Sequence, residues 1–187
     1  MLNYNQVLPE QKSFQDLQIK EVKPIMKLII RGKKRDFISS VGKSLSILLP
    51  TEANTSSQSA NLTALWLSPD EWMIFSNEPC DETSNDYSTE KLLNKNISKL
   101  DLGAITDVTD QFVMINLKGN KIYQLFQNGS PFNFNDFQYK KGSVTQTILL
   151  KIDVIIHNHK DNEVNLFVRR SFSEHLMSWV NDSASRL

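Results

Sequence analysis

Two histidines offer the first candidate for chemistry. His157 and His159 are separated by one residue, and on a β-strand that spacing points both rings to the same face. Two imidazoles on one face could together bind a metal ion, because neutral histidine nitrogens are common zinc ligands. No third ligand lies near them in the sequence. A solvated turn beside Asn158, Lys160 and Asp161 is therefore the favoured interpretation.

Carboxylates and the single cysteine are the next candidates. Asp70 and Glu71 fall in a predicted hairpin turn, and Asp107 and Asp110 bracket a tight turn between two predicted strands. Catalytic carboxylates need a pocket and raised pKa values, whereas aspartate is common in turns because it binds nearby backbone N–H groups. We therefore favour a structural role for all four. Cys80 lies in an acidic segment that would raise the pKa of its thiol and disfavour a thiolate nucleophile.

A dinucleotide site would require Gly-x-Gly-x-x-Gly at a strand-to-helix turn, where the backbone must approach a pyrophosphate closely. The chain has 6 glycines, and they are scattered along the sequence. Neither this motif nor a P-loop is present. We expect no catalytic, cofactor-binding or metal-binding residue on this chain.

Charge and composition exclude further classes of partner. The chain has 21 Lys and Arg residues against 21 Asp and Glu residues, and a balanced surface does not attract nucleic acid or anionic membranes over long distances. The basic stretch 31–35 could contact phosphate or an acidic partner, but a solvated turn is favoured. No apolar run approaches the roughly 20 residues that span a bilayer, and one cysteine forms no internal disulfide. We expect a cytoplasmic location and neither a nucleic-acid nor a membrane partner.

Aromatic residues at irregular positions are candidates for protein contacts, because aromatic side chains carry much of the energy of interfaces. Two of them flank a predicted hairpin turn and three crowd a segment without regular period: Trp66, Trp72, Phe132, Phe134 and Phe137. The alternative for the phenylalanines is a loop folded onto its own core, and the sequence does not decide between the two.

Basic residues stand just before the last predicted helix. Arg169 and Arg170 could face carboxylates of a partner, or could end an exposed strand. Ser171 and Glu174 form a capping-box pattern, which predicts that the helix starts there. Trp179 falls on the apolar face of that helix.

The elements that must position these residues fall into two groups. The second half of the chain reads as β-β-α-β-β-β-α, and the first half contains a fainter version of the same order. These patterns predict an α+β fold of two related units, each an antiparallel sheet covered by helices. We expect an N-terminal arm over residues 1–22 and a domain over 23–187, with approximate halves 23–103 and 104–187.

Four motifs, in a fixed order over roughly residues 25–183, resemble a known family. The most specific is the hairpin core Trp66-Leu67-Ser68-Pro69-Asp70-Glu71-Trp72. The others are the loop 49–55, the segment 107–110 followed by 117–119 and 129–131, and the segment 141–147 followed by 168–172 and Trp179. Together they are similar to the gamma subunit family of heterotetrameric sarcosine oxidase. Ser130 and Ser143 depart from this family's pattern, in which cysteine is common at both places.

The resemblance implies a fold like that of folate-binding aminomethyltransferases. It also implies membership of a complex that oxidatively demethylates sarcosine to glycine, with hydrogen peroxide and a one-carbon unit as products. Partners would be the alpha, beta and delta subunits, which would carry FAD, FMN, NAD, tetrahydrofolate and zinc, while this chain would carry none. Two alternatives stay open, an equivalent subunit of an N-methylglutamate-type dehydrogenase and a stand-alone folate-binding protein.

The resemblance and the aromatic and basic residues above give one set of family-motif and interface candidates: Trp66, Pro69, Asp70, Glu71, Trp72, Phe132, Phe134, Phe137, Arg169, Arg170, Ser171 and Trp179.

Overall fold

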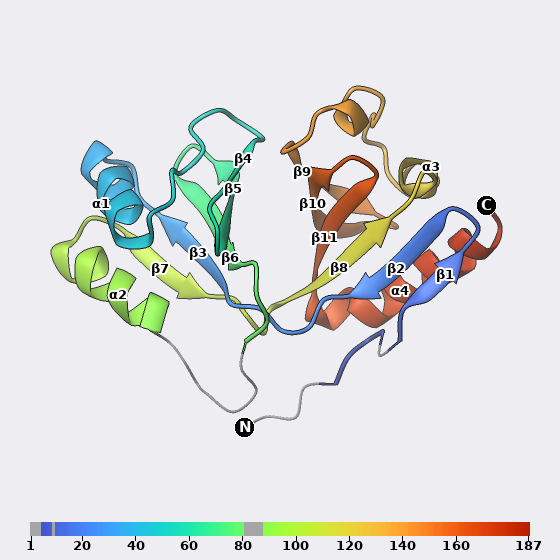
Figure 1. The fold of residues 1–187 in the computed structure, drawn as a ribbon, viewed down its shortest axis with the longest axis horizontal. Helices are drawn as coiled ribbons and strands as arrows, with labels where there is room; N and C mark the ends of the chain where they lie inside the picture. Colours follow the sequence, from blue (N-terminus) through green and yellow to red (C-terminus); the bar gives the residue numbers. More distant parts are fainter. Residues whose placement is uncertain (1–4, 9, 81–87) are drawn as a thin grey trace. The chain divides into compact units, whose positions relative to one another are not determined.

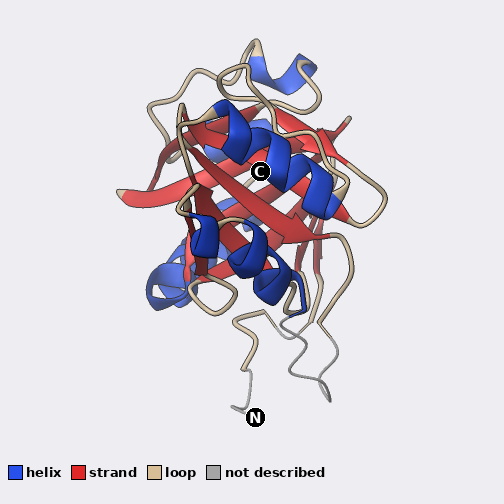
Figure 2. Cartoon of the chain, turned by 90° about the vertical axis from the view of Figure 1, so that its left-hand side faces the viewer, coloured by secondary structure: helices blue, strands red, loops and turns tan. Residues whose placement is uncertain are grey.

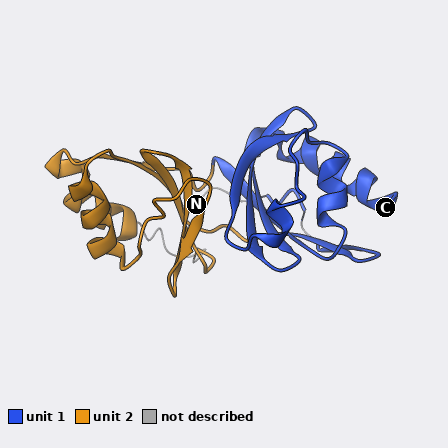
Figure 3. Ribbon diagram, turned by 90° about the horizontal axis from the view of Figure 1, so that it is seen from above, with its two compact units in different colours: residues 1–22, 111–187 blue, residues 23–110 orange. Residues whose placement is uncertain are grey.

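The computed structural model describes residues 5–8, 10–80 and 88–187. They form two compact units (Figure 3). One, the central unit, comprises residues 23–110, and the other, the terminal unit, comprises residues 1–22 and 111–187. Each unit is an antiparallel sheet with helices packed on one face, which is the α+β architecture that the sequence predicts.

The central unit has a five-stranded sheet in the order β4-β5-β6-β3-β7. Its strands are β3 (Lys27–Arg31), β4 (Ser56–Gln58), β5 (Leu62–Ser68), β6 (Glu71–Ser76) and β7 (Ala104–Asp107). Two helices, α1 (Arg35–Leu45) and α2 (Ser88–Asn96), lie over one face of the sheet, and the short 3-10 helix η1 (Ser98–Leu100) follows α2 (Figures 1 and 2).

Helix α1 contains a glycine, Gly42, and continues past it to Leu45. Phe37 and Val41 are fully buried on its inner face, and Leu45 packs partly against the same core. This additional apolar contact offsets the cost of Gly42 inside the helix, about 1 kcal/mol relative to alanine. The helix ends at Ser46, which takes the left-handed conformation with φ of 54°.

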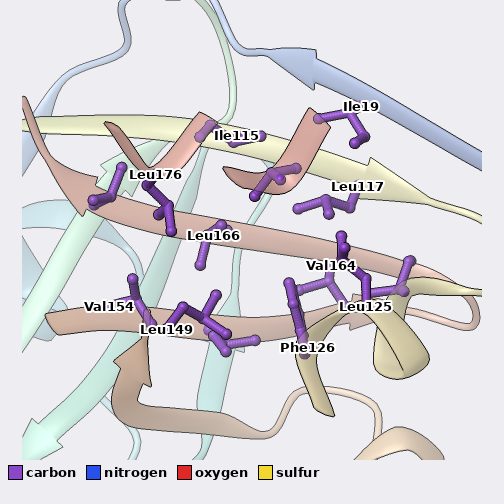
Figure 4. Packing of buried hydrophobic residues seen from close by; sticks show 14 of the residues in the cluster. Ile19, Ile115, Leu117, Leu125, Phe126, Leu149, Val154, Val164, Leu166 and Leu176 are labelled. Atoms are coloured by element: carbon purple, nitrogen blue, oxygen red, sulfur yellow. The ribbon is translucent and has the colours of Figure 1, made fainter. Parts of the chain in front are cut away.

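The terminal unit has a six-stranded sheet in the order β1-β2-β8-β11-β10-β9. Its strands are β1 (Lys12–Phe14), β2 (Leu17–Glu21), β8 (Phe112–Lys118), β9 (Val144–Leu149), β10 (Ile152–Lys160) and β11 (Glu163–Arg169). Helices α3 (Ile122–Gln127) and α4 (Arg170–Ser185) cover one face, and the 3-10 helix η2 (Phe137–Tyr139) precedes β9. Alternate strand residues such as Ile115, Val164 and Leu166 form the core under these helices (Figure 4).

The two sheets share a strand order. The chain passes through β3-α1-β4-β5-β6-α2 in the central unit and through β8-α3-β9-β10-β11-α4 in the terminal unit. The resulting orders, β4-β5-β6-β3 and β9-β10-β11-β8, correspond strand by strand. The next position is filled by β7 in the central unit and by β2 in the terminal unit. The units are therefore related, as the sequence predicts.

The N-terminal segment expected as an arm supplies that strand of the terminal unit. Leu17, Ile19 and Glu21 alternate as buried residues, and β2 pairs with β8 from Gln18 opposite Lys118 onward. Residues 1–4 and 9 of the segment lie outside the described part of the chain. The expected boundary between residues 103 and 104 also differs from the observed one after residue 110, because β7 pairs with β3 of the central unit.

Helix α4 starts without the capping box that the sequence predicts. The helix follows β11 directly, its N-cap residue is Arg169, and no side chain caps it. Ser171 consequently lies within the first helical turn, while the Ser173 hydroxyl donates to the Arg170 carbonyl at 2.7 Å. The expected start was wrong because the chain turns from strand to helix one residue before the serine.

Candidate functional site

The family-motif hairpin consists of β5 and β6 joined at Pro69 and Asp70, and its apolar side is part of the central core. Trp72 lies opposite Trp66 in the strand pairing and is only 2% exposed. Its indole N–H donates to the Pro50 carbonyl at 2.8 Å, and its ring lies 5.8 Å from that of Phe37. Trp66 is half-buried against the same cluster. The most specific motif of the sequence therefore fixes the local fold.

The turn of this hairpin neutralises part of the basic stretch that precedes α1. Arg31 lies 3.6 Å from Glu71 and 3.8 Å from Asp70, and Lys33 lies 3.9 Å from Asp70. A hydrogen bond from Ser68, helped by the two basic side chains, lowers the pKa of Asp70. Such exposed ion pairs contribute little to stability, but they leave less unpaired positive charge here for an anionic partner.

The phenylalanine segment folds onto the core of its own unit. Phe134 is fully buried and Phe137 is 7% exposed. Both rings lie about Tyr123, at centroid distances of 5.9 and 6.3 Å, and Phe132 packs partly buried against Phe134 at 4.9 Å. Burial raises the pKa of Tyr123 to about 12. Of the two interpretations of this segment, the structure supports core packing for Phe134 and Phe137.

The candidates around α4 divide between surface and core. Arg169 and Ser171 are exposed, and Arg170 is half-buried with its backbone N–H bonded to the Gln111 carbonyl at 2.8 Å. Trp179 is half-buried and packs against the core of the terminal unit. Pro69, at the hairpin turn, is exposed. The candidates are therefore distributed over both units, and Trp72, Phe134 and Phe137 serve the packing of their own unit.

The two histidines lie in β10 on the same strand face, with ring centroids 5.6 Å apart. His157 is 2% exposed, and burial together with the neighbouring His159 lowers its pKa to about 3. Burial and the charge of Lys160 also lower the pKa of His159. Over residues 5–8, 10–80 and 88–187, no three His, Cys, Asp or Glu side chains are grouped to hold a metal ion. We assign His157 to the sheet interior as a neutral residue.

The remaining reactive groups have structural environments. Asp107 accepts a hydrogen bond from the Thr109 backbone at 2.8 Å, which is the turn role that the sequence predicts. Partial burial is the main cause that raises the pKa of the Cys80 thiol, with Asp107 and Asp110 adding to it against Lys27. No helix in the described part of the chain is long and apolar enough to cross a membrane.

The sequence patterns do not predict one exposed aromatic residue, Tyr139. Tyr139 closes the phenylalanine segment and is 83% exposed, unlike its neighbours Phe134 and Phe137. The signal in the sequence is the pair Lys140 and Lys141 immediately after it, since lysine is almost never fully buried and two in succession place the chain at the surface there.

One family model matches most of the chain, and solved structures share its fold. The model of the sarcosine oxidase, gamma subunit family matches residues 31–186. The chain is similar to heterotetrameric sarcosine oxidase from Corynebacterium sp. U-96 in complex with pyrrole 2-carboxylate, with a TM-score of 0.80, 18% identity, and 91% of this chain and 84% of that chain covered. No curated protein matches it significantly.

A second solved structure relates the fold to another enzyme. The chain is similar to the glycine cleavage system aminomethyltransferase T from Bartonella henselae, with a TM-score of 0.63 and 11% identity. The match covers 91% of this chain and 49% of the aminomethyltransferase, about half its length. At such identities the likeness concerns the fold, which is aminomethyltransferase-like.

Proposed function

The chain belongs to the sarcosine oxidase gamma subunit family, and on this basis we propose that it is the assembly subunit of a heterotetrameric sarcosine oxidase and does not itself react with substrate. The observation that carries the proposal is the family match over residues 31–186. The match extends over both units and leaves out β1, β2 and all of β3 except Arg31. The match favours this role over an N-methylglutamate-type subunit or a stand-alone folate-binding protein.

The placement of the motif residues supports an assembly role. Trp72 is locked by packing and by a hydrogen bond to Pro50, and Phe134 and Phe137 lie in the terminal core. Such residues order the interior of each unit, and an ordered unit binds partners at a lower entropy cost than a mobile one. In a complex that moves electrons and a one-carbon unit between sites, fixed register keeps the reacting groups aligned.

The proposal assigns the chemistry to the partner chains. The alpha, beta and delta subunits would hold FAD, FMN, NAD, tetrahydrofolate and zinc, and this chain would contribute no cofactor ligand. The complex would act in the cytoplasm, in sarcosine catabolism and one-carbon metabolism. It would convert sarcosine to glycine with hydrogen peroxide and formaldehyde or methylenetetrahydrofolate as products.

Co-expression tests the proposal. The three partner chains are produced with and without this chain, and both the yield of assembled flavoprotein and the hydrogen peroxide formed from sarcosine are measured. We expect a low yield of complex without this chain, restored when it is supplied. Full assembly and full turnover in its absence would refute the assembly role.

A further inference from the structure

The loop over residues 137–143, here called the Tyr139 loop, presents an aromatic side chain to solvent. It comprises η2 and the turn that leads to β9, and it is drawn at the top of the terminal unit in Figure 1. Tyr139 is 83% exposed, the largest exposed fraction among the exposed large apolar side chains of the described residues. An exposed tyrosine of this kind is a frequent anchor of protein interfaces, because it offers a large contact area with few rotatable bonds.

The backbone of the Tyr139 loop is held from beneath by one buried side chain. Asn158 of β10 is 1% exposed, and its amide donates to three loop carbonyls, those of Phe137 at 2.9 Å, Gln138 at 3.3 Å and Lys140 at 3.1 Å. The Asn158 carbonyl accepts from Gly142 at 2.7 Å, and its N–H donates to Ser143 at 2.9 Å. A buried asparagine used in this way fixes the loop before any partner binds.

Two further features restrict the loop. The Phe137 ring is buried among the rings of Tyr123, Phe132 and Phe134. Gly142 has φ of 82°, a conformation that glycine adopts without strain and that returns the chain to β9. Because the loop is already ordered, little conformational entropy remains to be lost when Tyr139 enters a partner surface.

The Tyr139 loop carries two lysines and no carboxylate of its own. Lys140 and Lys141 are exposed, as is Lys160 at the end of β10, and none of the three forms an ion pair with another described residue. Lys160 and Lys141 lower the pKa of His159 and Glu163 raises it, so two ammonium groups and one carboxylate lie around the same point of the surface. In the basic stretch before α1, in contrast, Arg31 and Lys33 are paired with Asp70 and Glu71.

We propose that the Tyr139 loop is a docking site for an acidic surface of a partner subunit, with Tyr139 inserted into a recess and the lysines facing carboxylates. The inference rests on the proposed function and adds the surface through which it acts. A protein is favoured over nucleic acid because the chain as a whole has no net charge, whereas nucleic-acid binders extend basic surface well beyond one loop. Opposite charges across the interface steer association and fix its register.

Binding measurements on the partner chains, obtained by dissociating the complete complex and removing this chain, test the proposal. The purified chain is titrated onto these partners at several salt concentrations, and Tyr139→Ala and the double variant Lys140→Glu, Lys141→Glu are compared with wild type. Tyr139→Ala weakens the affinity by about tenfold or more at every salt concentration. The double variant weakens it most at low salt and flattens its salt dependence.

Matched substitutions elsewhere serve as controls. Leu100→Ala removes another exposed large apolar side chain, and Lys95→Glu with Lys99→Glu reverses two exposed lysines of the central unit. Both controls bind within about twofold of wild type, as expected for exposed residues outside the interface. Thermal melts of all variants match wild type, because the altered side chains are exposed.

The outcomes separate the two proposals. If wild type binds and the loop variants bind with the same affinity, the docking site is overturned and the assembly role stands. An absence of wild-type binding refutes the assembly role and the docking site with it. Binding of wild type to an oligonucleotide or to anionic vesicles, lost in the loop variants while partner binding persists, also overturns the protein docking site.

Discussion

At the scale of single residues, the family signature acts through packing. Trp72→Ala removes a fully buried ring and leaves the Pro50 carbonyl without its donor, so we expect a loss of about 3–5 kcal/mol in the free energy of unfolding. Trp72→Phe keeps much of the contact with Phe37 and costs less, because only the hydrogen bond and part of the ring are lost. Urea denaturation measures both, and equal stability of Trp72→Ala and wild type would contradict the packing role.

The buried histidine makes stability depend on pH. The pKa of His157 is about 3 in the folded chain and about 6.5 in the unfolded chain. Between these values the unfolded state binds the additional proton, so the free energy of unfolding falls as pH falls, by about 1.4 kcal/mol per pH unit for one group. Above pH 6.5 this dependence disappears.

Chemical denaturation of wild type and His157→Gln at a series of pH values from about 7 to 4 tests this. We expect the slope to decrease in His157→Gln and to remain in the control His175→Gln, since His175 is exposed. An identical slope in wild type and His157→Gln would show that the histidine does not stay neutral in the folded chain.

Gly129 occupies a position where a larger residue does not fit, because the Trp179 ring of α4 packs against it. A Cβ atom at Gly129 would lie 2.6 Å from the Trp179 ring, which is closer than packed atoms tolerate, and overpacking of this kind costs about 1–3 kcal/mol. Gly129→Ala therefore lowers the melting temperature. The loss is smaller when Trp179→Ala is also present, because the smaller residue leaves room.

Gly42→Ala is the matched control for that clash. A Cβ atom there approaches its nearest neighbour, the Ile47 carbonyl, only to 3.4 Å, and alanine favours the helical state that α1 already has. We expect unchanged or slightly raised stability. Additive losses for Gly129→Ala and Trp179→Ala in a double-mutant cycle would count against the contact.

At the scale of elements, the terminal unit depends on a strand from the other end of the chain. β2 occupies the sheet position that β7 fills in the central unit. Ile19→Ala should therefore cost about 2–5 kcal/mol of unfolding free energy, because Ile19 is fully buried. Lys20→Ala, on the exposed face of the same strand, should change stability by less than about 0.5 kcal/mol. Comparable losses in the two variants would mean that β2 does not pack as described.

Elements with strong local signals could be predicted from the sequence, and elements defined by distant pairing could not. The hairpin around Pro69 and Asp70 was predictable because a turn signal separates two apolar runs. β2 was missed because its alternation is short and includes Glu21, a charged residue at a buried position. Glu21 is accommodated there because its carboxylate accepts the Leu8 N–H at 2.8 Å, a contact between residues far apart in sequence.

The candidate interface was harder to predict than the fold. Phe134, Phe137 and Tyr139 stand in one irregular segment, and periodicity does not separate inward from outward residues where neither helix nor strand is regular. Which of them is buried and which is exposed depends on the 3-10 helix η2 and on Asn158. Asn158 lies 19 or more positions further along the chain. The capping pattern at Ser171 was misleading for a related reason, since α4 begins directly at the end of β11.

At the scale of the whole molecule, the chain consists of two related units, each with a packed core of its own. Family membership indicates the complex in which the chain would act. The buried motif residues stabilise the fold of each unit. The Tyr139 loop, which is ordered before binding, is the proposed contact with a partner. Interfaces of this kind gain affinity from order that exists before binding.

Recovery of the tagged chain from its native cell tests this claim most directly. The purified material is analysed by native mass spectrometry and by its absorption spectrum. We predict a complex of four different chains with a flavin spectrum, and a lone chain without flavin once the complex is dissociated. A free monomer in the cell, or flavin that stays with this chain after its partners are removed, would contradict the account.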